Sequence, residues 1–328
     1  MRGPQASVGP QGPVGLQGFQ GVIGSQGSRG PQGIRGQQGA QGSQGTIPLN
    51  VLIYGQGVNP PLVINAGNSP FVLSEDGYFT DVTVDASGVL DTNGYRVFIN
   101  GTLLLNGTIE NDGGSAVTST PGTGAPSGSL GGGSNGGGGG TAGVSIANAL
   151  GGPGGEGGTG VIVMGMTIIA FAGAFGGTVT PPLPVDGGSN LAHNALAVLQ
   201  GRTLATNVPF NGGSGGGGGG NASFAGAGGG GGGVIVLAAY MFDPSSMGTI
   251  RANGGVGGDG RSTTVGSTTN SGGGGGGGGG GFVSVFTSCT GIPLGVSVTA
   301  LGGVGGIGET PASDGSTGSN GTVSIFIT

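Results

Sequence analysis

The sequence predicts a fibrous protein whose C-terminal part is all-β. Glycine recurs at every third position near the N-terminus, and later in the chain uninterrupted glycine tracts alternate with short apolar runs. Glycine accounts for 92 of 328 residues, yet 34% of residues are hydrophobic and only 6% are charged. Disordered chains combine low hydrophobicity with high charge, so this composition favours an ordered structure. We expect three parts, at residues 1–45, 46–114 and 115–328.

Residues 1–45 follow a three-residue repeat. Glycine stands at Gly3 and at every third position from Gly9 to Gly45, and Ala6 is the exception. This is the Gly-X-Y rule of the collagen triple helix, in which only glycine fits at the axis where three chains meet. The repeat therefore predicts a triple-helical stalk. Because one chain cannot form such an axis, it also predicts a homotrimer.

Proline in this segment occurs only directly after glycine, and the third position of each triplet is mostly glutamine. This pattern resembles the collagen-like fibre proteins of bacteria and phages, in which prolyl hydroxylation plays no part. The alternative for residues 1–45 is a disordered arm rich in Gly and Gln.

Residues 46–114 are expected to form a β-rich neck of short strands or β-helix-like coils. Apolar and β-branched runs recur there between turn residues, beginning with VLIYG (51–55), PLVIN (61–65) and PFVLS (70–74). Such runs are typical of strands, and Asn93-Gly94 favours a tight turn. Around Val82 and Val84 we expect an antiparallel pair with the valines buried and the flanking aspartates solvated.

Residues 115–328 contain the glycine tracts 215–220, 228–233 and 272–281. Apolar runs that read as strands follow or flank the tracts, at Val161–Met164, Val234–Leu237, Phe282–Phe286 and Val323–Ile327. Glycine can adopt an extended threefold helix and pack side by side with its neighbours. We therefore expect polyglycine-II-like helices packed with β-strands rather than flexible linkers. The pattern resembles the polyglycine-sandwich adhesins of phage tail fibres.

A degenerate repeat also runs through the glycine-rich part. NGTIENDGG (106–114) resembles MGTIRANGG (247–255), and ANGGVGGDG (252–260) resembles ALGGVGGIG (300–308). Self-similar segments of this kind indicate stacked structural units.

The residue inventory predicts a non-enzymatic protein with no catalytic residues, no cofactor and no metal site. Lysine is absent, and His193 and Cys289 are the only residues of their kinds. The stretch GGVGGDGRS (254–262) matches only half of a calcium-binding nonapeptide. Asp81, Asp85 and Asp91 could attract a cation in a trimer, but we expect them to be solvated surface residues.

Charge and length exclude two further classes of partner. With a net charge of −6 and few basic residues, the chain has no basic track for nucleic acid. The apolar stretch 160–175 is shorter than the roughly 20 residues of a membrane-spanning helix, so we expect a buried strand. No signal peptide precedes the repeat, which favours assembly in the cytoplasm and release by lysis.

Together these features predict a structural fibre at a virion or extracellular surface, in particular a phage tail fibre that presents loops to a host cell-surface receptor. Recognition commonly resides in loops on a rigid scaffold. The candidate loops, rich in Ser, Thr, Asn and Pro, are 116–130, 176–190, 203–214, 261–271 and 309–320. The alternative function is a self-assembling extracellular or appendage filament of collagen-like trimers joined end to end.

Overall fold

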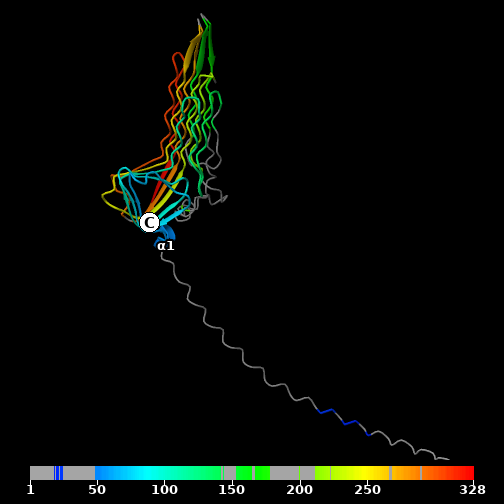
Figure 1. Ribbon diagram of the computed structural model, residues 1–328, viewed down its shortest axis with the longest axis vertical. Coiled ribbons are helices and arrows are strands. Elements are labelled where there is room, and N and C mark those ends of the chain that lie inside the picture. The colour runs from blue at the N-terminus through cyan, green and yellow to red at the C-terminus, as the bar shows by residue number, and fades with distance from the viewer. Residues whose placement is uncertain are drawn as a thin grey trace, which may run out of the picture. The chain divides into compact units, whose positions relative to one another are not determined.

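The computed structural model divides the chain into two compact units, Met1–Gly45 and Thr46–Thr328 (Figure 1). The described residues are 18, 20–21, 23–24, 49–141, 143, 153–164, 167–177, 199, 211–221, 223–265, 268–288 and 290–328. Most of the first unit, including the predicted triple-helical stalk, lies outside them. The architecture is therefore that of the second unit alone. Its described part is rich in β-structure and has very little helix.

Two parallel sheets form the base of the second unit. Sheet A has the order β1-β4-β6-β10-β14-β16, and β3 also pairs with β6. Its strands are β1 (Leu62–Ile64), β3 (Gly77–Phe79), β4 (Val82–Val84), β6 (Val97–Leu105), β10 (Val234–Phe242), β14 (Phe282–Thr287) and β16 (Thr322–Ile327). Sheet B has the order β15-β11-β7-β5-β2. Its strands are β2 (Phe71–Val72), β5 (Val89–Asp91), β7 (Thr108–Glu110), β11 (Thr249–Arg251) and β15 (Ser297–Thr299).

The chain alternates between the two sheets. Strand β4 is followed by β5, β6 by β7, β10 by β11 and β14 by β15, so each A–B pair is one coil of a solenoid. The exception is β3 and β4, which follow each other within sheet A and both pair with β6. Because the chain otherwise crosses to sheet B before it returns to sheet A, neighbouring strands within a sheet point the same way. The antiparallel pair expected around Val82 and Val84 is therefore wrong: β4 pairs in parallel with β1 and β6.

The hydrophobic core lies between the sheets. Residues that alternate along the strands of sheet A, such as Ile235 and Leu237 on β10, are fully buried against Ile109 and Ile250 of sheet B. This alternation follows from the pleat, which sends successive side chains to opposite faces. Val82 and Val84 are buried in this core, as the sequence predicts.

A second cluster covers the outer face of sheet A. The helix α1 (Leu49–Tyr54) places Tyr54 against Phe98 and Phe286 there, and the Tyr54 ring meets Tyr240 edge to face at 5.4 Å. The run VLIYG was expected to be a strand, and that prediction is wrong. Tyr54 is buried and Ile53 is partly buried by packing onto the face of a sheet, whereas Leu52 is 60% exposed. Such tertiary packing overrides the weak β-propensity of a short run.

The degenerate repeat corresponds to successive coils. Segment 106–114 lies beside 247–255, with Thr108 opposite Thr249 and Glu110 opposite Arg251 in sheet B. Likewise 252–260 lies beside 300–308, joined by backbone hydrogen bonds such as Gly254 N–H to the Leu301 carbonyl at 2.8 Å. Strand β6 pairs with β10 and β7 with β11. Residues 46–114 and the glycine-rich segment after them thus share one pair of sheets.

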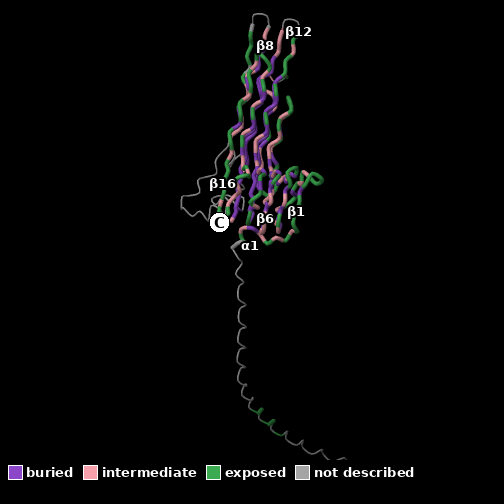
Figure 2. Tube along the Cα trace, turned by 90° about the vertical axis from the view of Figure 1, so that its left-hand side faces the viewer, coloured by how far each residue is buried: buried purple, intermediate pink, exposed green. Residues whose placement is uncertain are grey.

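From sheet B the chain leaves the solenoid along glycine-rich tracts and returns along others to sheet A (Figure 2). Tract 252–260 follows β11 and tract 272–281 precedes β14, while 300–308 follows β15 and 313–321 precedes β16. The tracts are hydrogen-bonded laterally at every third residue. For example, N–H groups of one tract donate to carbonyls of another in the pairs Gly226–Gly273, Gly229–Gly276 and Gly232–Gly279. This is the periodicity of an extended threefold helix, and we call the assembly the glycine lattice.

Tract 272–281 lies at the centre of the lattice and has six neighbouring segments. Its N–H groups donate to carbonyls in 214–220, 252–258 and 313–319, and its carbonyls accept N–H groups from 155–158, 226–232 and 303–309. With three residues per turn, successive N–H groups point in three directions and the carbonyls in three others. The backbone satisfies itself without side chains. The ten-residue glycine tract is therefore a building element of the fold.

Side chains are excluded from this centre but appear at the periphery. A Cβ built on Gly277 would overlap the backbone carbonyl of Gly303, so no residue larger than glycine fits there. In the outer tract 300–308, by contrast, every third residue carries a side chain that is exposed, namely Leu301, Val304 and Ile307. Uninterrupted glycine thus marks the centre of the lattice, and an X-Gly-Gly pattern marks its edge.

Gly277→Ala is expected to destabilise the second unit by about 3 kcal/mol, because the added methyl group meets rigid backbone. The matched control is Gly138→Ala, whose Cβ would meet nothing closer than Thr141 Oγ1 at 3.5 Å, with an expected change within about 1 kcal/mol. Denaturant unfolding followed by tyrosine fluorescence measures both, since every tyrosine lies outside residues 1–45. Equal stabilities of the two variants would contradict the lattice packing.

Candidate functional site

The glycine lattice ends in a small antiparallel sheet, here called the distal sheet. Its strand order is β12-β13-β8-β9. The strands are β8 (Gly160–Met164), β9 (Thr167–Phe171), β12 (Ser262–Val265) and β13 (Thr268–Ser271). Figure 2 shows β8 and β12 at the end of the unit opposite α1 and the C-terminus. The distal sheet is thus held away from the solenoid by the length of the lattice.

Lattice tracts lead directly into both hairpins of the distal sheet. Strand β12 follows tract 252–260 and β13 ends immediately before Gly272, whose N–H donates to the Arg261 carbonyl at 2.9 Å. Below the other hairpin, the Gly157 N–H donates to the Ala174 carbonyl at 2.9 Å. Because the hairpins continue the hydrogen bonding of the lattice, their backbone is presented on a rigid support.

The distal sheet is polar in one half and aliphatic in the other. On β12 and β13 the hydroxyl groups of Thr264 and Thr269 are hydrogen-bonded across the strands at 3.2 Å. On β9, Ile168 is 69% exposed and its neighbour Ile169 is 39% exposed. Successive residues face opposite sides of a sheet, so solvent reaches both faces. Ile168 and Ile169 therefore leave apolar surface exposed on opposite faces of β9.

The apolar stretch 160–175 was expected to be a buried strand. Strand structure is confirmed, since β8 and β9 pair with Val163 opposite Ile168, but burial is wrong for Ile168 and for Phe175, which is 73% exposed. The stretch folds back on itself at the end of the lattice instead of entering a core. A glycine inside an apolar run is a sequence signal for a chain reversal. In the described part of the chain, no helix combines the length and apolarity needed to span a membrane.

The predicted recognition loops lie in different parts of the structure. Loop 261–271 is the β12–β13 hairpin of the distal sheet, and 309–320 begins beside it, with Ser271 Oγ donating to the Thr310 carbonyl at 3.1 Å. Loop 116–130 contains a short turn and then joins the lattice, where the Gly122 N–H donates to the Gly228 carbonyl. Loops 176–190 and 203–214 lie mostly outside the described residues. The β8–β9 hairpin belongs to the site but was not among the predicted loops.

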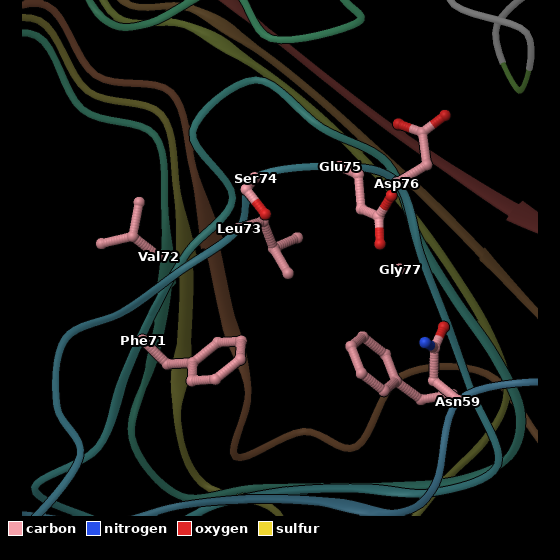
Figure 3. A pocket seen from close by; sticks show the side chains of 9 residues that line it. Asn59, Phe71, Val72, Leu73, Ser74, Glu75, Asp76 and Gly77 are labelled. Carbon is pink, nitrogen blue, oxygen red and sulfur yellow. The ribbon is translucent and has the colours of Figure 1, made fainter.

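A separate pocket lies at the first coil (Figure 3). It is lined by Asn59, Phe71, Val72, Leu73, Ser74, Glu75, Asp76, Gly77 and Phe79. The carboxylate of Asp76 pairs with the Arg96 guanidinium at 2.7 Å and accepts a hydrogen bond from Ser129 Oγ at 2.5 Å. These contacts fix the corner between β2 and β3, so the pocket is explained by the structure of the coil.

The aspartates considered for cation binding do not converge. Asp81 Oδ1 accepts the Thr102 N–H, and Asp91 Oδ1 accepts the Asn93 N–H, both at 2.8 Å. In the GGVGGDGRS stretch, Asp259 Oδ1 accepts the Ile307 N–H of the neighbouring tract. Among the described residues, no group of three or more His, Cys, Asp or Glu side chains could hold a metal ion. His193 and Cys289 lie outside the described residues.

A group of charges sits where sheet B enters the lattice. Arg251 pairs with Glu110 at 2.5 Å and with Asp112 at 2.7 Å, and Asp112 Oδ1 accepts the Asn253 N–H at 2.7 Å. Burial raises the pKa of Asp112 to about 6, although the Asn253 N–H and Arg251 oppose the shift. Burial also raises the pKa of Asp91. The group therefore couples folding to pH.

The second unit is expected to lose stability as pH rises from about 4 through 6. An acid whose pKa is higher in the folded state binds its proton more tightly there, so its contribution is fully present below the unfolded value of 3.8 and is lost above the folded value of about 6. At about 1.4 kcal/mol per pKa unit, the loss is at most about 3 kcal/mol. Unfolding at several pH values measures it. The control Asp112→Asn keeps an acceptor for the Asn253 N–H and should flatten the profile; an unchanged slope would contradict the assignment.

Comparison with known proteins bears on the first unit. Residues 1–48 match the family described as collagen triple helix repeat (20 copies). No curated protein and no solved structure was found to match the chain. The N-terminal segment is thus a collagen-like repeat, which indicates a structural fibre protein, and it is joined to a glycine-rich unit of β-strands.

Proposed function

We propose that this protein is a non-enzymatic fibre of the virion or phage tail-fibre type, whose distal sheet binds a receptor on the surface of a host cell. The observation that carries the proposal is the exposed distal sheet at the end of the glycine lattice. Ile168 and Ile169 on β9 offer apolar contacts on both faces, and the threonines of β12 and β13 offer hydroxyl groups. A rigid support keeps the entropy cost of binding low.

In this proposal the protein is a homotrimer. The collagen-like repeat in residues 1–48 supports this state, because a triple helix needs three chains around its axis. A trimer also presents three distal sheets, and linked copies bind a surface more tightly than single ones. The protein would act at a virion or extracellular surface.

A second function, a self-assembling filament, is favoured by the edge of the distal sheet. Strand β9 is an edge strand without charge or proline, in the sequence TIIAF, and such edges readily pair with other strands. Electron microscopy of the purified full-length protein separates the two functions. Discrete particles of uniform size support the fibre, whereas filaments of indefinite length support self-assembly.

Ile168→Asp is expected to reduce binding to host cells about tenfold or more, since it places a charge at the centre of the proposed contact. Binding of fluorescently labelled full-length protein to a panel of bacteria, scored on the strains that the wild-type protein labels, measures the effect. Val117→Asp is the matched control, because Val117 is also 69% exposed but lies in the turn of residues 117–120. Equal loss of binding in both variants, or in neither, would contradict a receptor site at the distal sheet.

A further inference from the structure

The last coil of the solenoid lacks a covering layer in the described structure. Strands β14 and β15 form the coil before it, and β16 then adds one more strand to sheet A, whereas sheet B ends at β15. The ends of a solenoid expose the core of their terminal unit unless something covers them. At this end, the side of β16 that continues the core has no strand of sheet B opposite it.

The residues of β16 on that side are core residues by sequence and register. Val323 and Ile325 lie beside Val283 and Val285 of β14, which are fully buried between the sheets. Yet Val323, Ile325 and Ile327 are 40%, 48% and 63% exposed. On the opposite side of the same strand, Phe326 stacks on Phe286 with ring centroids 4.7 Å apart. One side of β16 is therefore packed and the other is an uncovered apolar strip.

The last tract that leaves the solenoid, residues 300–308, also carries exposed apolar side chains. In earlier tracts, most outward side chains accept hydrogen bonds from the next tract: Asp112 Oδ1 accepts the Asn253 N–H, and Asn253 Oδ1 accepts the Leu301 N–H. Val256 differs, since it is aliphatic and 43% exposed. In tract 300–308 the equivalent positions are Leu301, Val304 and Ile307, which have no acceptor and are 49%, 61% and 65% exposed. A further glycine tract would bring N–H groups that these aliphatic side chains cannot bind. The side chains suit contact with another apolar surface instead.

These two strips lie on consecutive segments at the end of the solenoid, since tract 300–308 leaves from β15 and the chain then returns to β16. We call them the last-coil face: Leu301, Val304, Ile307, Val323, Ile325 and Ile327. The segments that carry them, 282–308 and 315–328, contain no charged residue. The charges between them, Glu309 and Asp314, lie at the far end of tract 300–308, where Asp314 Oδ1 accepts the Gly308 N–H. A chain with a net charge of −6 repels its own copies, but the part of this face that is nearest the solenoid can meet a second copy without bringing like charges together.

We propose that the last-coil face is the surface through which three copies of residues 46–328 pack against one another. The inference rests on the proposed homotrimer and assigns the contact that the collagen-like repeat alone leaves open. The repeat brings three chains together and so holds three copies of the face at high local concentration. Packed around a common axis, each face covers the open core of its neighbours and supplies the missing layer of the last coil.

The test removes the stalk's contribution while keeping the full chain. In a stalk-disabled variant, Gly18, Gly21 and Gly24 are replaced by alanine, which disrupts a triple helix at its crowded axis; loss of the collagen circular dichroism signal verifies this. Light scattering at high micromolar concentration should give the mass of three chains. Adding Val304→Asp should give the mass of one chain. Aspartate is tolerated at such a position, since Asp259 occupies one in the neighbouring tract.

Two controls keep the outcomes apart. Val117→Asp in the stalk-disabled chain should leave the trimer intact, and Ile325→Asp should separate it as Val304→Asp does. A single-chain mass for the stalk-disabled protein, while the wild-type protein is trimeric, would overturn the proposed face but leave the proposed function standing. A single-chain wild-type protein would overturn both. A mass that grows with concentration would also overturn the closed trimer.

Discussion

Lateral hydrogen bonding between glycine tracts is the constraint on which the second unit depends. The central tract 272–281 is bonded to six neighbouring segments, and a Cβ at Gly277 would overlap the backbone of Gly303. Glycine normally disfavours order because it loses the most backbone entropy on folding. Here its lack of a side chain lets backbones approach closely enough for each N–H from Gly272 to Gly281 to find a carbonyl. The cost in entropy is offset by hydrogen bonds that larger residues could not make.

The solenoid gives the lattice its register. Tracts 272–281 and 313–321 run directly into β14 and β16, whose residues pair one to one from Phe282 opposite Thr322. Glycine tracts have no side chains to distinguish one register from another, whereas the buried residues of sheet A do. The apolar strands therefore fix which glycines meet, and the lattice extends that arrangement to the distal sheet. Glycine at every third position is what close packing of threefold helices around an axis requires, and the collagen-like repeat has this sequence. The glycine lattice packs threefold helices closely in an array.

A scaffold without side chains concentrates specific contacts at its boundaries. Inside the lattice nearly all contacts are between backbones, with few exceptions such as Ser134 Oγ, which accepts the Gly215 N–H. Side chains that can contact other molecules therefore lie in the distal sheet, in the outer tracts and at the end of the solenoid. The described boundaries differ in character: Thr264 and Ile168 make the distal sheet mixed, Asp112 and Arg251 make the base of the lattice charged, and the last-coil face is wholly apolar. The three boundaries therefore suit contacts of different chemistry: mixed polar and apolar at the distal sheet, charged at the base of the lattice, and apolar at the last-coil face.

The sequence by itself determined the three-residue repeat of the first 45 residues, the strands at 234–237, 282–286 and 323–327, and the burial of Val82 and Val84, because each depends on local spacing and hydrophobicity. Only the tertiary structure decided that the sheets are parallel, that 51–54 is helical and that Ile168 is exposed. Those features depend on which segments, far apart in the chain, lie side by side. Strand direction follows from the route that the chain takes between the two sheets, and exposure follows from where the lattice ends. Neither can be predicted from a run of neighbouring residues.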